Sequence, residues 1–429
     1  MKQSESGNTG NAVTGFPILR SFRNPDYRFY LPGSLAQFTA LSMQIFSGPF
    51  LMYHLTGSKT LLGTMALISA FPMIFVSLFG GAIADRIKKK RIVIACVLAS
   101  AVVAVGIALL LSSGIISREK EGSWWILMAA VLIMGSLMGL MMPALQALVA
   151  DIVKREQLMN AVAVNTMGMN ILFVIGPRLA SYLIDTYGYD SVYFAMAGCY
   201  VLSAFFIFFV RGTGVTTSPA PGPASIAPDK ANIMGEIQKG FQYIRKEPMI
   251  LAVLVFSLLV TVLSQPYQQL LPIFVEDIFK VGTTGGGELM MIAGLGALIG
   301  SIVITFLPNK KRGLMLLGSG LVAGFALISF SFSTIWGLSL GTMVFIGLAQ
   351  TFRMTISSTL LQAYSKPEYR GRVMSIFSMQ WGLMSIFTFI AGILSETVSV
   401  QWVLGSLAML LVALSLLSLV FVRSIRRVE

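Results

Sequence analysis

The sequence predicts an all-α integral membrane protein with twelve transmembrane helices in two pseudo-symmetric six-helix bundles. Of its 429 residues, 55% are hydrophobic and only 11% are charged, whereas soluble domains carry roughly 25% charged residues. The apolar residues come in runs of about 20, the length at which a helix crosses roughly 30 Å of hydrocarbon. A long polar break in the middle of the chain separates six of these runs from the other six.

Each apolar run contains few charged residues and is bounded by polar loops. Sustained runs of this length are typical of spanning helices, because only a helix satisfies its own backbone groups in lipid. The predicted spans are residues 29–53, 60–84, 92–113, 124–149, 161–184, 191–210, 249–274, 287–307, 314–331, 335–360, 373–397 and 401–422.

The distribution of Lys and Arg predicts how the chain is oriented. With the N-terminus inside, the inner segments hold 25 of the 31 Lys and Arg residues and the outer loops hold four. This asymmetry follows the positive-inside rule and predicts that both termini are cytoplasmic. The net charge of +13 therefore reflects topology, and we expect no nucleic-acid partner. We expect a multi-pass protein of the plasma membrane, which in a bacterium is the inner membrane.

The polar break predicts a cytoplasmic linker between the two bundles. It contains the stretch GTGVTTSPAPGPASIAPDKANI, whose composition cannot pack a core. The next stretch, MGEIQKGFQYIRKEP, has an amphipathic pattern and predicts a helix on the membrane surface. The predicted parts are a cytoplasmic tail at 1–28, an N-terminal bundle at 29–210, the linker at 211–248, a C-terminal bundle at 249–422 and a cytoplasmic tail at 423–429.

The loop between the second and third spans carries a family resemblance. Its sequence GGAIADRIKKKR resembles the loop 2–3 signature of the major facilitator superfamily, although Lys88 stands where the family has a second glycine. The resemblance extends over essentially the whole chain and implies the twelve-helix fold and transport by alternating access. The residues that match the signature are Gly81, Asp85, Arg86, Lys89 and Lys90.

Two further motifs are similar to those of exporters in this superfamily. In the fifth span, NILFVIGPRLASYLI resembles the exporters' Gly-Pro motif through Gly176 and Pro177. The stretch PEYRGRVMSIFSM, before the eleventh span, is closest to the drug and siderophore exporter branch. The resemblance therefore implies a chain that moves small molecules out of the cell.

The resemblance also implies a gating role for Asp85. In the family the corresponding aspartate interacts with the start of the eleventh helix, expected here near Gly371 and Arg372. A carboxylate at a helix N-terminus gains roughly 0.3–1 kcal/mol, and Arg372 offers a charge partner. The alternative is an ordinary surface ion pair, worth about 0–1 kcal/mol, in a loop whose cations only set topology. We predict that Asp85→Asn preserves folding and abolishes most transport.

Polar side chains inside the spans are candidates to line a substrate cavity. Charges within a span are costly and normally face a cavity or a partner, and buried amides need hydrogen-bond partners that a wet cavity supplies. The alternatives are hydrogen bonds between helices for the glutamines and snorkelling toward the interface for Arg353. The candidate residues are Gln37, Gln44, Gln265, Gln268, Gln269, Gln350, Arg353 and Arg178.

Cofactor and metal sites are not expected. No P-loop motif is present in the sequence, and His54 is the only histidine, so the chain cannot build a His-based metal site. No Asp or Glu lies in the middle of a predicted span, although proton coupling usually requires a buried titratable group. Glu288, at the mouth of the eighth span, is the candidate coupling residue.

The sequence therefore predicts a secondary transporter and not an enzyme, acting as a monomer in the lipid bilayer on a small-molecule substrate. The exporter motifs imply that it exports a small amphipathic compound, such as a drug, a siderophore or a similar metabolite, by proton antiport. One alternative is a carrier for an anionic or lipid-like substrate, based on Arg178 and Arg353. A further alternative is a membrane sensor or scaffold that transports nothing.

Overall fold

The computed structural model describes residues 24–84, 88–120, 122–153, 155–211, 233–307 and 310–421. Within these ranges the chain forms helices joined by short loops and contains no strand. Ten helical runs are long and apolar enough to cross a membrane. The helices α1 (Pro25–Thr56) and α2 (Lys59–Ala84) bring the number of long helical runs to twelve, which confirms the predicted all-α membrane fold.

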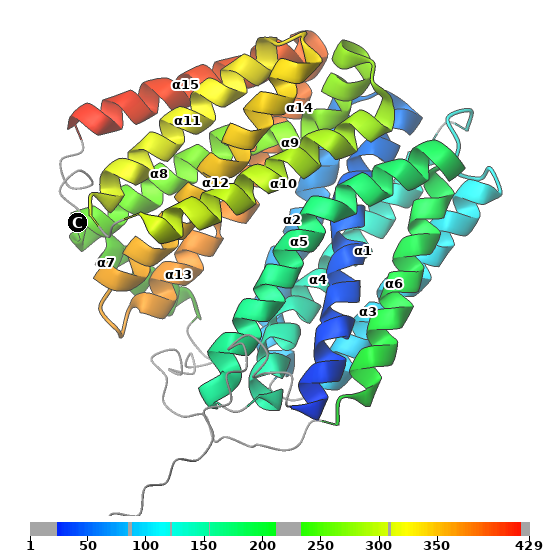
Figure 1. Ribbon diagram of the computed structural model, residues 1–429, viewed down its shortest axis with the longest axis horizontal. Helices are drawn as coiled ribbons and strands as arrows, with labels where there is room; N and C mark the ends of the chain where they lie inside the picture. Colours follow the sequence, from blue (N-terminus) through cyan, green and yellow to red (C-terminus); the bar gives the residue numbers. More distant parts are fainter. Residues whose placement is uncertain are drawn as a thin grey trace, which may run out of the picture.

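The first six helices form one group, drawn from blue to green in Figure 1. α1 packs against α5 and α6, α2 packs against α4, and α3 packs against both α4 and α6. This group is the N-terminal half. The remaining helices of the half are α3 (Lys89–Ser112), α4 (Trp124–Ile152), α5 (Arg155–Tyr187) and α6 (Tyr189–Phe209).

The later helices form the C-terminal half. Two of its runs are interrupted: α8, α9 and the π-helix η2 follow one another over 248–279, and α13 continues into α14 over 370–397. The elements are α7 (Ile233–Lys246), α8 (Pro248–Ser264), α9 (Pro266–Ile273), η2 (Phe274–Phe279), α10 (Gly282–Phe306), α11 (Arg312–Phe332), α12 (Trp336–Tyr364), α13 (Arg370–Ser378), α14 (Gln380–Thr397) and α15 (Val400–Phe421).

Local sequence explains where several helices begin and break. Asn24 caps α1 by accepting a hydrogen bond from the Asp26 amide, and Pro25 occupies the first turn, where a missing N–H costs nothing. Gly57 ends α1 with φ +62°, a left-handed conformation that suits glycine. Pro266 has no amide hydrogen to donate, and the run it belongs to breaks at Gln265.

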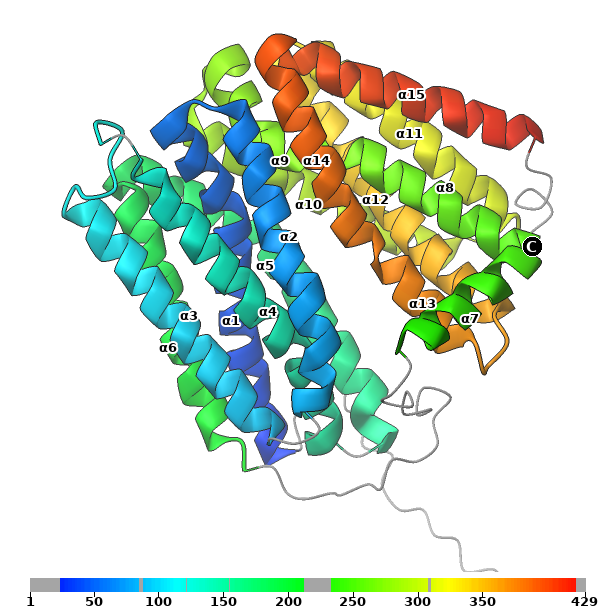
Figure 2. The ribbon, with the colours of Figure 1, turned by 180° about the vertical axis from the view of Figure 1, so that it is seen from behind.

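The short helix α7 lies against the start of α13 (Figure 2). The Tyr243 ring on α7 stacks on Tyr369, with centroids 4.2 Å apart and planes at 10°. The Tyr243 hydroxyl also accepts a hydrogen bond of 3.1 Å from the Lys366 amide. The amphipathic helix after the linker is therefore attached to the segment that leads into the eleventh span.

The two halves converge at one end and diverge at the other (Figures 1 and 2). We call the converging end, which bears the α1–α2 turn at Gly57, the closed end. The opposite end, where α1, α3 and α13 begin, is the open end. Between the halves, α5 packs along α10 and α2 packs along α14.

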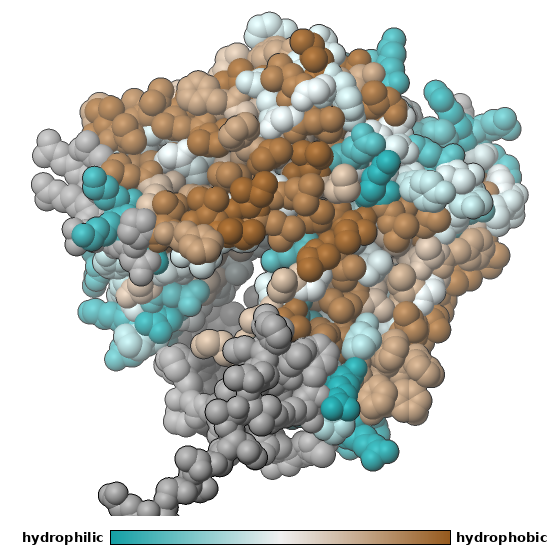
Figure 3. All heavy atoms as spheres, in the orientation of Figure 1, coloured by the Kyte–Doolittle hydropathy of each residue, from teal (hydrophilic) through white to brown (hydrophobic). Residues whose placement is uncertain are grey.

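The surface is consistent with a protein embedded in lipid. Hydrophobic residues cover broad areas of the face over α10 and α11, and hydrophilic residues gather toward the two ends (Figure 3). The same view shows the surface hollowed between the two halves. Contiguous apolar patches of this extent mark membrane contact.

Candidate functional site: the interface between the halves and the buried polar clusters

Hydrogen bonds join the two halves at the closed end. The Tyr53 hydroxyl on α1 donates to the Asp277 carboxylate on η2 over 2.6 Å. At the α1–α2 turn, the Ser58 hydroxyl and the Thr60 amide both donate to Glu396 on α14, over 2.9 and 3.0 Å. These three hydrogen bonds to carboxylates therefore connect one half to the other.

An ion pair joins the halves beside these hydrogen bonds. Arg178 on α5 and Glu288 on α10 approach to 3.3 Å between Nη2 and Oε1, with side chains 36% and 34% exposed. Arg178 Nη1 also donates to the Thr284 carbonyl over 3.3 Å. In return, the Thr284 amide donates to Asp185 on α5 over 2.8 Å. The structure thus brings together Arg178, a candidate for the substrate cavity, and Glu288, the candidate coupling residue.

Small residues allow the helices of the two halves to approach closely at this end. A Cβ atom on Gly287 of α10 would lie 2.9 Å from the Pro177 carbonyl of α5. A Cβ atom on Gly392 of α14 would lie 2.8 Å from the Lys59 carbonyl and 3.1 Å from Gly63 Cα on α2. A side chain at either glycine would force the two backbones apart. Within the N-terminal half, the motif residue Gly176 is similarly tight, since its Cβ would collide with Ser42 on α1.

At the open end, the described part of the predicted gate contacts its own half. Lys89 pairs with Asp151 on α4 at 2.7 Å, and Lys90 donates to the Phe208 and Val210 carbonyls at the end of α6 over 2.7 and 2.6 Å. Both lysines therefore brace the start of α3. The predicted gate residues Asp85 and Arg86 lie outside the described residues.

The other predicted gate residues lie at helix ends. Gly81 is in the last turn of α2, which ends at Ala84. α13 begins at Arg370, whereas the sequence predicts the start of this helix near Gly371 and Arg372 and the span itself from residue 373. Gly371 has open space where a side chain would be, and the Arg372 guanidinium lies 5.1 Å from the centre of the Tyr369 ring.

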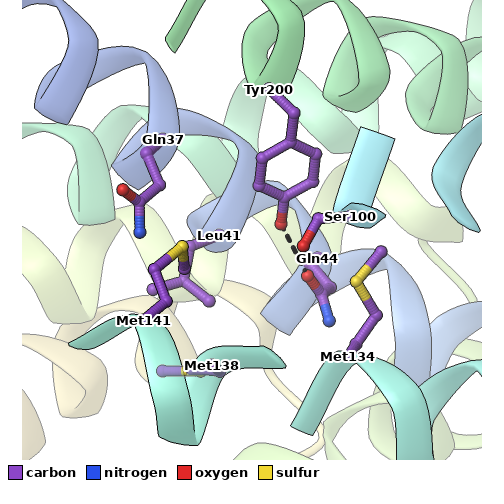
Figure 4. A pocket seen from close by; sticks show the side chains of 8 residues that line it. All are labelled: Gln37, Leu41, Gln44, Ser100, Met134, Met138, Met141 and Tyr200. Carbon is purple, nitrogen blue, oxygen red and sulfur yellow. Dashed lines mark hydrogen bonds between the residues drawn. The ribbon is translucent and has the colours of Figure 1, made fainter. Parts of the chain in front are cut away.

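Two candidate glutamines lie in a small pocket inside the N-terminal half (Figure 4). Its volume is about 10 Å³, close to the minimum that holds one water molecule. Gln37 is fully buried, and neither its Oε1 nor its Nε2 has a hydrogen-bond partner. Gln44, one heptad further along α1, accepts a hydrogen bond of 2.9 Å from the Tyr200 hydroxyl. The pocket is lined by Gln37, Leu41, Gln44, Ser100, Met134, Met138, Met141 and Tyr200.

The three glutamines around the α8–α9 break do not share one environment. Gln265 is buried, and its Oε1 has no partner. Gln268 makes a 3.5 Å contact with the Tyr267 hydroxyl. Gln269 donates to the Leu62 carbonyl of α2 over 3.3 Å, which makes it another contact between the halves.

On α12, Gln350 is half-buried and Arg353 is 1% exposed. Arg353 Nη1 donates to Ser257 Oγ on α8 and to Gln380 Oε1 on α14, both over 3.1 Å. In this conformation the guanidinium thus lies between three helices of the C-terminal half.

Several contacts at these sites were not anticipated from the sequence. Tyr53 and Ser58 each donate a hydrogen bond to an acid of the other half. Gln380 accepts a hydrogen bond from Arg353. A buried amide in an apolar span was the only signal for Gln380. Its partner lies on another helix, and spacing along one chain does not predict such a pairing.

The sequence matches a known family over most of its length. A sequence model described as Major Facilitator Superfamily matches residues 30–387 and 309–428. Macrolide efflux protein A of Streptococcus pyogenes is 26% identical over 356 residues, which cover 81% of this chain and 82% of that protein. Enterobactin exporter EntS of Shigella boydii is 23% identical over 364 residues, covering 83% and 82% respectively.

The fold agrees with this match. The crystal structure of the nucleoside transporter NupG superimposes with a TM-score of 0.69 at 14% identity and covers 93% of this chain and 99% of that one. The comparisons therefore confirm the resemblance to drug and siderophore exporters and point to transport rather than catalysis. The chain belongs to the Major Facilitator Superfamily and is a multi-pass membrane transporter.

Proposed function

We propose that the protein exports a small amphipathic compound by alternating access, with protons as the counter-transported ion. The observation that carries this proposal is the asymmetry between the two ends. The contacts that join the halves lie at the closed end, and the halves diverge at the open end. A carrier of two bundles in this arrangement admits substrate from the open end.

The charge distribution orients this carrier in the membrane. Among the described residues, basic side chains of the predicted inner segments lie at the open end, where Lys89 and Lys90 begin α3 and Arg370 begins α13. By the positive-inside rule this end faces the cytoplasm. Substrate would therefore enter from the cytoplasm and leave when the closed end opens.

The Arg178–Glu288 pair supports a role for Glu288 in coupling. The pair exists only while α5 and α10 are together at the closed end. A proton on Glu288 would remove the negative charge and with it the ion pair. Protonation of Glu288 and the arrangement of this end would therefore be linked, because a ligand that binds two states unequally shifts their populations.

Exporter relatives support the substrate class. One relative is a macrolide efflux protein and another an enterobactin exporter, and methionines line the pocket of the N-terminal half. Methionine side chains adapt to varied apolar surfaces. We therefore propose substrates that combine an apolar surface with polar groups.

A transport assay in proteoliposomes tests the substrate and the coupling together. The panel includes a macrolide and enterobactin, each measured with and without a pH gradient. We expect at least one compound to accumulate against its gradient only when protons flow the other way. Glu288→Gln should abolish this gradient-driven movement, while the matched closed-end variant Glu396→Gln should retain it. Transport that ignores the pH gradient would reject antiport.

Cross-linking tests alternating access independently of the substrate. Ser58→Cys/Glu396→Cys, in a background with Cys96 and Cys199 replaced by Ser, places two thiols where the side chains now form a hydrogen bond of 2.9 Å. A short bis-methanethiosulfonate, which forms a disulfide with each thiol, should join them and stop transport, and reduction should restore it. Full transport by the cross-linked protein would show that the closed end does not open during the cycle.

A further inference from the structure

The C-terminal half contains a buried arginine that forms no ion pair with any carboxylate among the described residues. Arg353 is 1% exposed and contacts Ser257 and Gln380 through Nη1. Within the described ranges, the ion pairs shorter than 4.0 Å are Lys89–Asp151 and Arg178–Glu288, and neither includes Arg353. A buried ion without a counter-charge is strongly disfavoured, so burial of this guanidinium calls for a negative group.

The hydrogen bonds around Arg353 leave donors unused. Among the described residues, its Nη2 has no hydrogen-bond partner, and neither has Nε2 of Gln380. Gln380 Oε1 accepts from Arg353 Nη1 over 3.1 Å and also lies 2.8 Å from the Thr261 hydroxyl, whose single proton has the Ser257 carbonyl as a second acceptor at 2.7 Å. The guanidinium can only donate, so it fixes the amide orientation with the oxygen toward Arg353 and leaves Nε2 as a free donor.

A third unpartnered group lies on the same helix face. The Ser357 hydroxyl, one turn after Arg353 on α12, is fully buried and makes no hydrogen bond. A hydroxyl donates to an anion as readily as it donates to a carbonyl oxygen. The buried donors that remain available on α12 and α14 are thus an N–H of Arg353, an N–H of the Gln380 amide that contacts it, and the O–H of Ser357 one turn along α12.

We propose that Arg353, Gln380 and Ser357 bind a small monovalent anion, either a halide or a compact carboxylate group. The anion would neutralise the guanidinium and accept hydrogen bonds from the free donors, linking α12 to α14. Because Arg353 is so deeply buried, the ligand is small and is distinct from the exported compound. The site would stabilise the C-terminal half whether or not export is coupled to protons.

Thermal unfolding of the full chain in detergent tests the proposal. The midpoint is followed by tryptophan fluorescence in sodium chloride, bromide or formate, and compared with a bulky sulfonate salt at equal ionic strength. We expect a saturable rise of several degrees with at least one small anion. A rise with halides identifies an inorganic ion, and a rise with formate alone identifies a carboxylate ligand. No rise with any of the three would overturn the proposal.

Variants assign the effect to the site. Arg353→Met should remove the rise, and Gln380→Met should raise the half-saturating anion concentration at least threefold. Arg178→Met, which removes the other arginine within a span, should leave the anion dependence unchanged. If Arg353→Met does not fold, Gln380→Met and Ser357→Ala still test the site, because both keep the guanidinium. An unchanged anion dependence in the variants that fold would refute the assignment.

Discussion

The guanidinium of Arg178 and the carboxylate of Glu288 join the two halves of the transporter, with Nη2 and Oε1 3.3 Å apart at the closed end. Both side chains are about one-third exposed, so the pair contributes only about 0–1 kcal/mol to stability. The ion pair matters because it depends on conformation: a separation of α5 from α10 would break it. A contact of modest energy can still bias two arrangements of similar free energy.

Reversal of this pair separates its structural role from its role in coupling. Arg178→Glu and Glu288→Arg should each lower cross-linking of the Ser58→Cys/Glu396→Cys pair and reduce transport at least tenfold, because like charges would then face each other. The double reversal should restore the cross-linking yield, because the pair re-forms. Gradient-driven transport should stay low in the double variant, because the carboxylate now lies on α5. Recovery of full transport would contradict a coupling role for the position of Glu288.

Close packing of α2 against α14 predicts a variant that favours the other conformation. In Gly392→Leu the new side chain would meet the backbone of Lys59 and Gly63 within about 3 Å, so the closed end should open. We expect the cross-linking yield of the Ser58→Cys/Glu396→Cys pair to fall at least threefold. Gly106→Leu on α3 is the control, since no atom lies within 4 Å of its Cβ position. Equal yields in the two variants would show that α2 and α14 separate by another route.

The two glutamines of the N-terminal pocket should respond to substitution in opposite ways. Gln37→Met removes two buried polar atoms without partners and should raise the unfolding midpoint, because leaving such atoms unsatisfied costs about 1–3 kcal/mol. Gln44→Met breaks the hydrogen bond from Tyr200 and should lower stability by about 1 kcal/mol. Thermal unfolding in detergent measures both. A lower midpoint for Gln37→Met would indicate that a bound water already satisfies its amide.

The contact between α7 and α13 predicts a local effect on the start of the eleventh span. Tyr243→Ala removes the stacking on Tyr369 and the hydrogen bond from the Lys366 amide, a loss of about 1–2 kcal/mol. Hydrogen exchange of the amides over residues 366–373 should accelerate. Tyr243→Phe keeps the ring and should give an intermediate rate. Wild-type exchange in Tyr243→Ala would mean that α7 does not hold this segment.

Hydropathy predicted the membrane fold because each span must satisfy the same local requirement. About 20 apolar residues are needed to cross the hydrocarbon, and every backbone group must bond within the helix. The break at Gln265 was also predictable, because Pro266 cannot donate to the preceding turn. The ends of the helices were harder to predict from hydropathy. The predicted span ends at residue 360, but α12 continues to Tyr364 because a helix can extend by a polar turn beyond the hydrocarbon.

The roles of individual polar residues depended on partners in other helices. Arg353 was predicted to line a cavity because a charge within a span is costly, and the structure adds its contacts with Ser257 and Gln380. Arg178 and Glu288 were considered separately for substrate and coupling, and the structure places them within 3.3 Å of each other. The position of a polar side chain within a span predicts that it needs a partner. Which residue becomes that partner depends on how the helices pack.

By itself, the sequence determined a twelve-span helical membrane protein with a family signature and a basic side, because burial in lipid and charge placement act locally along each segment. Only the tertiary structure decided that the halves meet at the closed end, near Tyr53 and Glu396. It also decided that Arg353 is buried and forms no ion pair with a carboxylate among the described residues. These features arise from contacts between helices far apart in the chain, and such contacts exist only once the helices have packed.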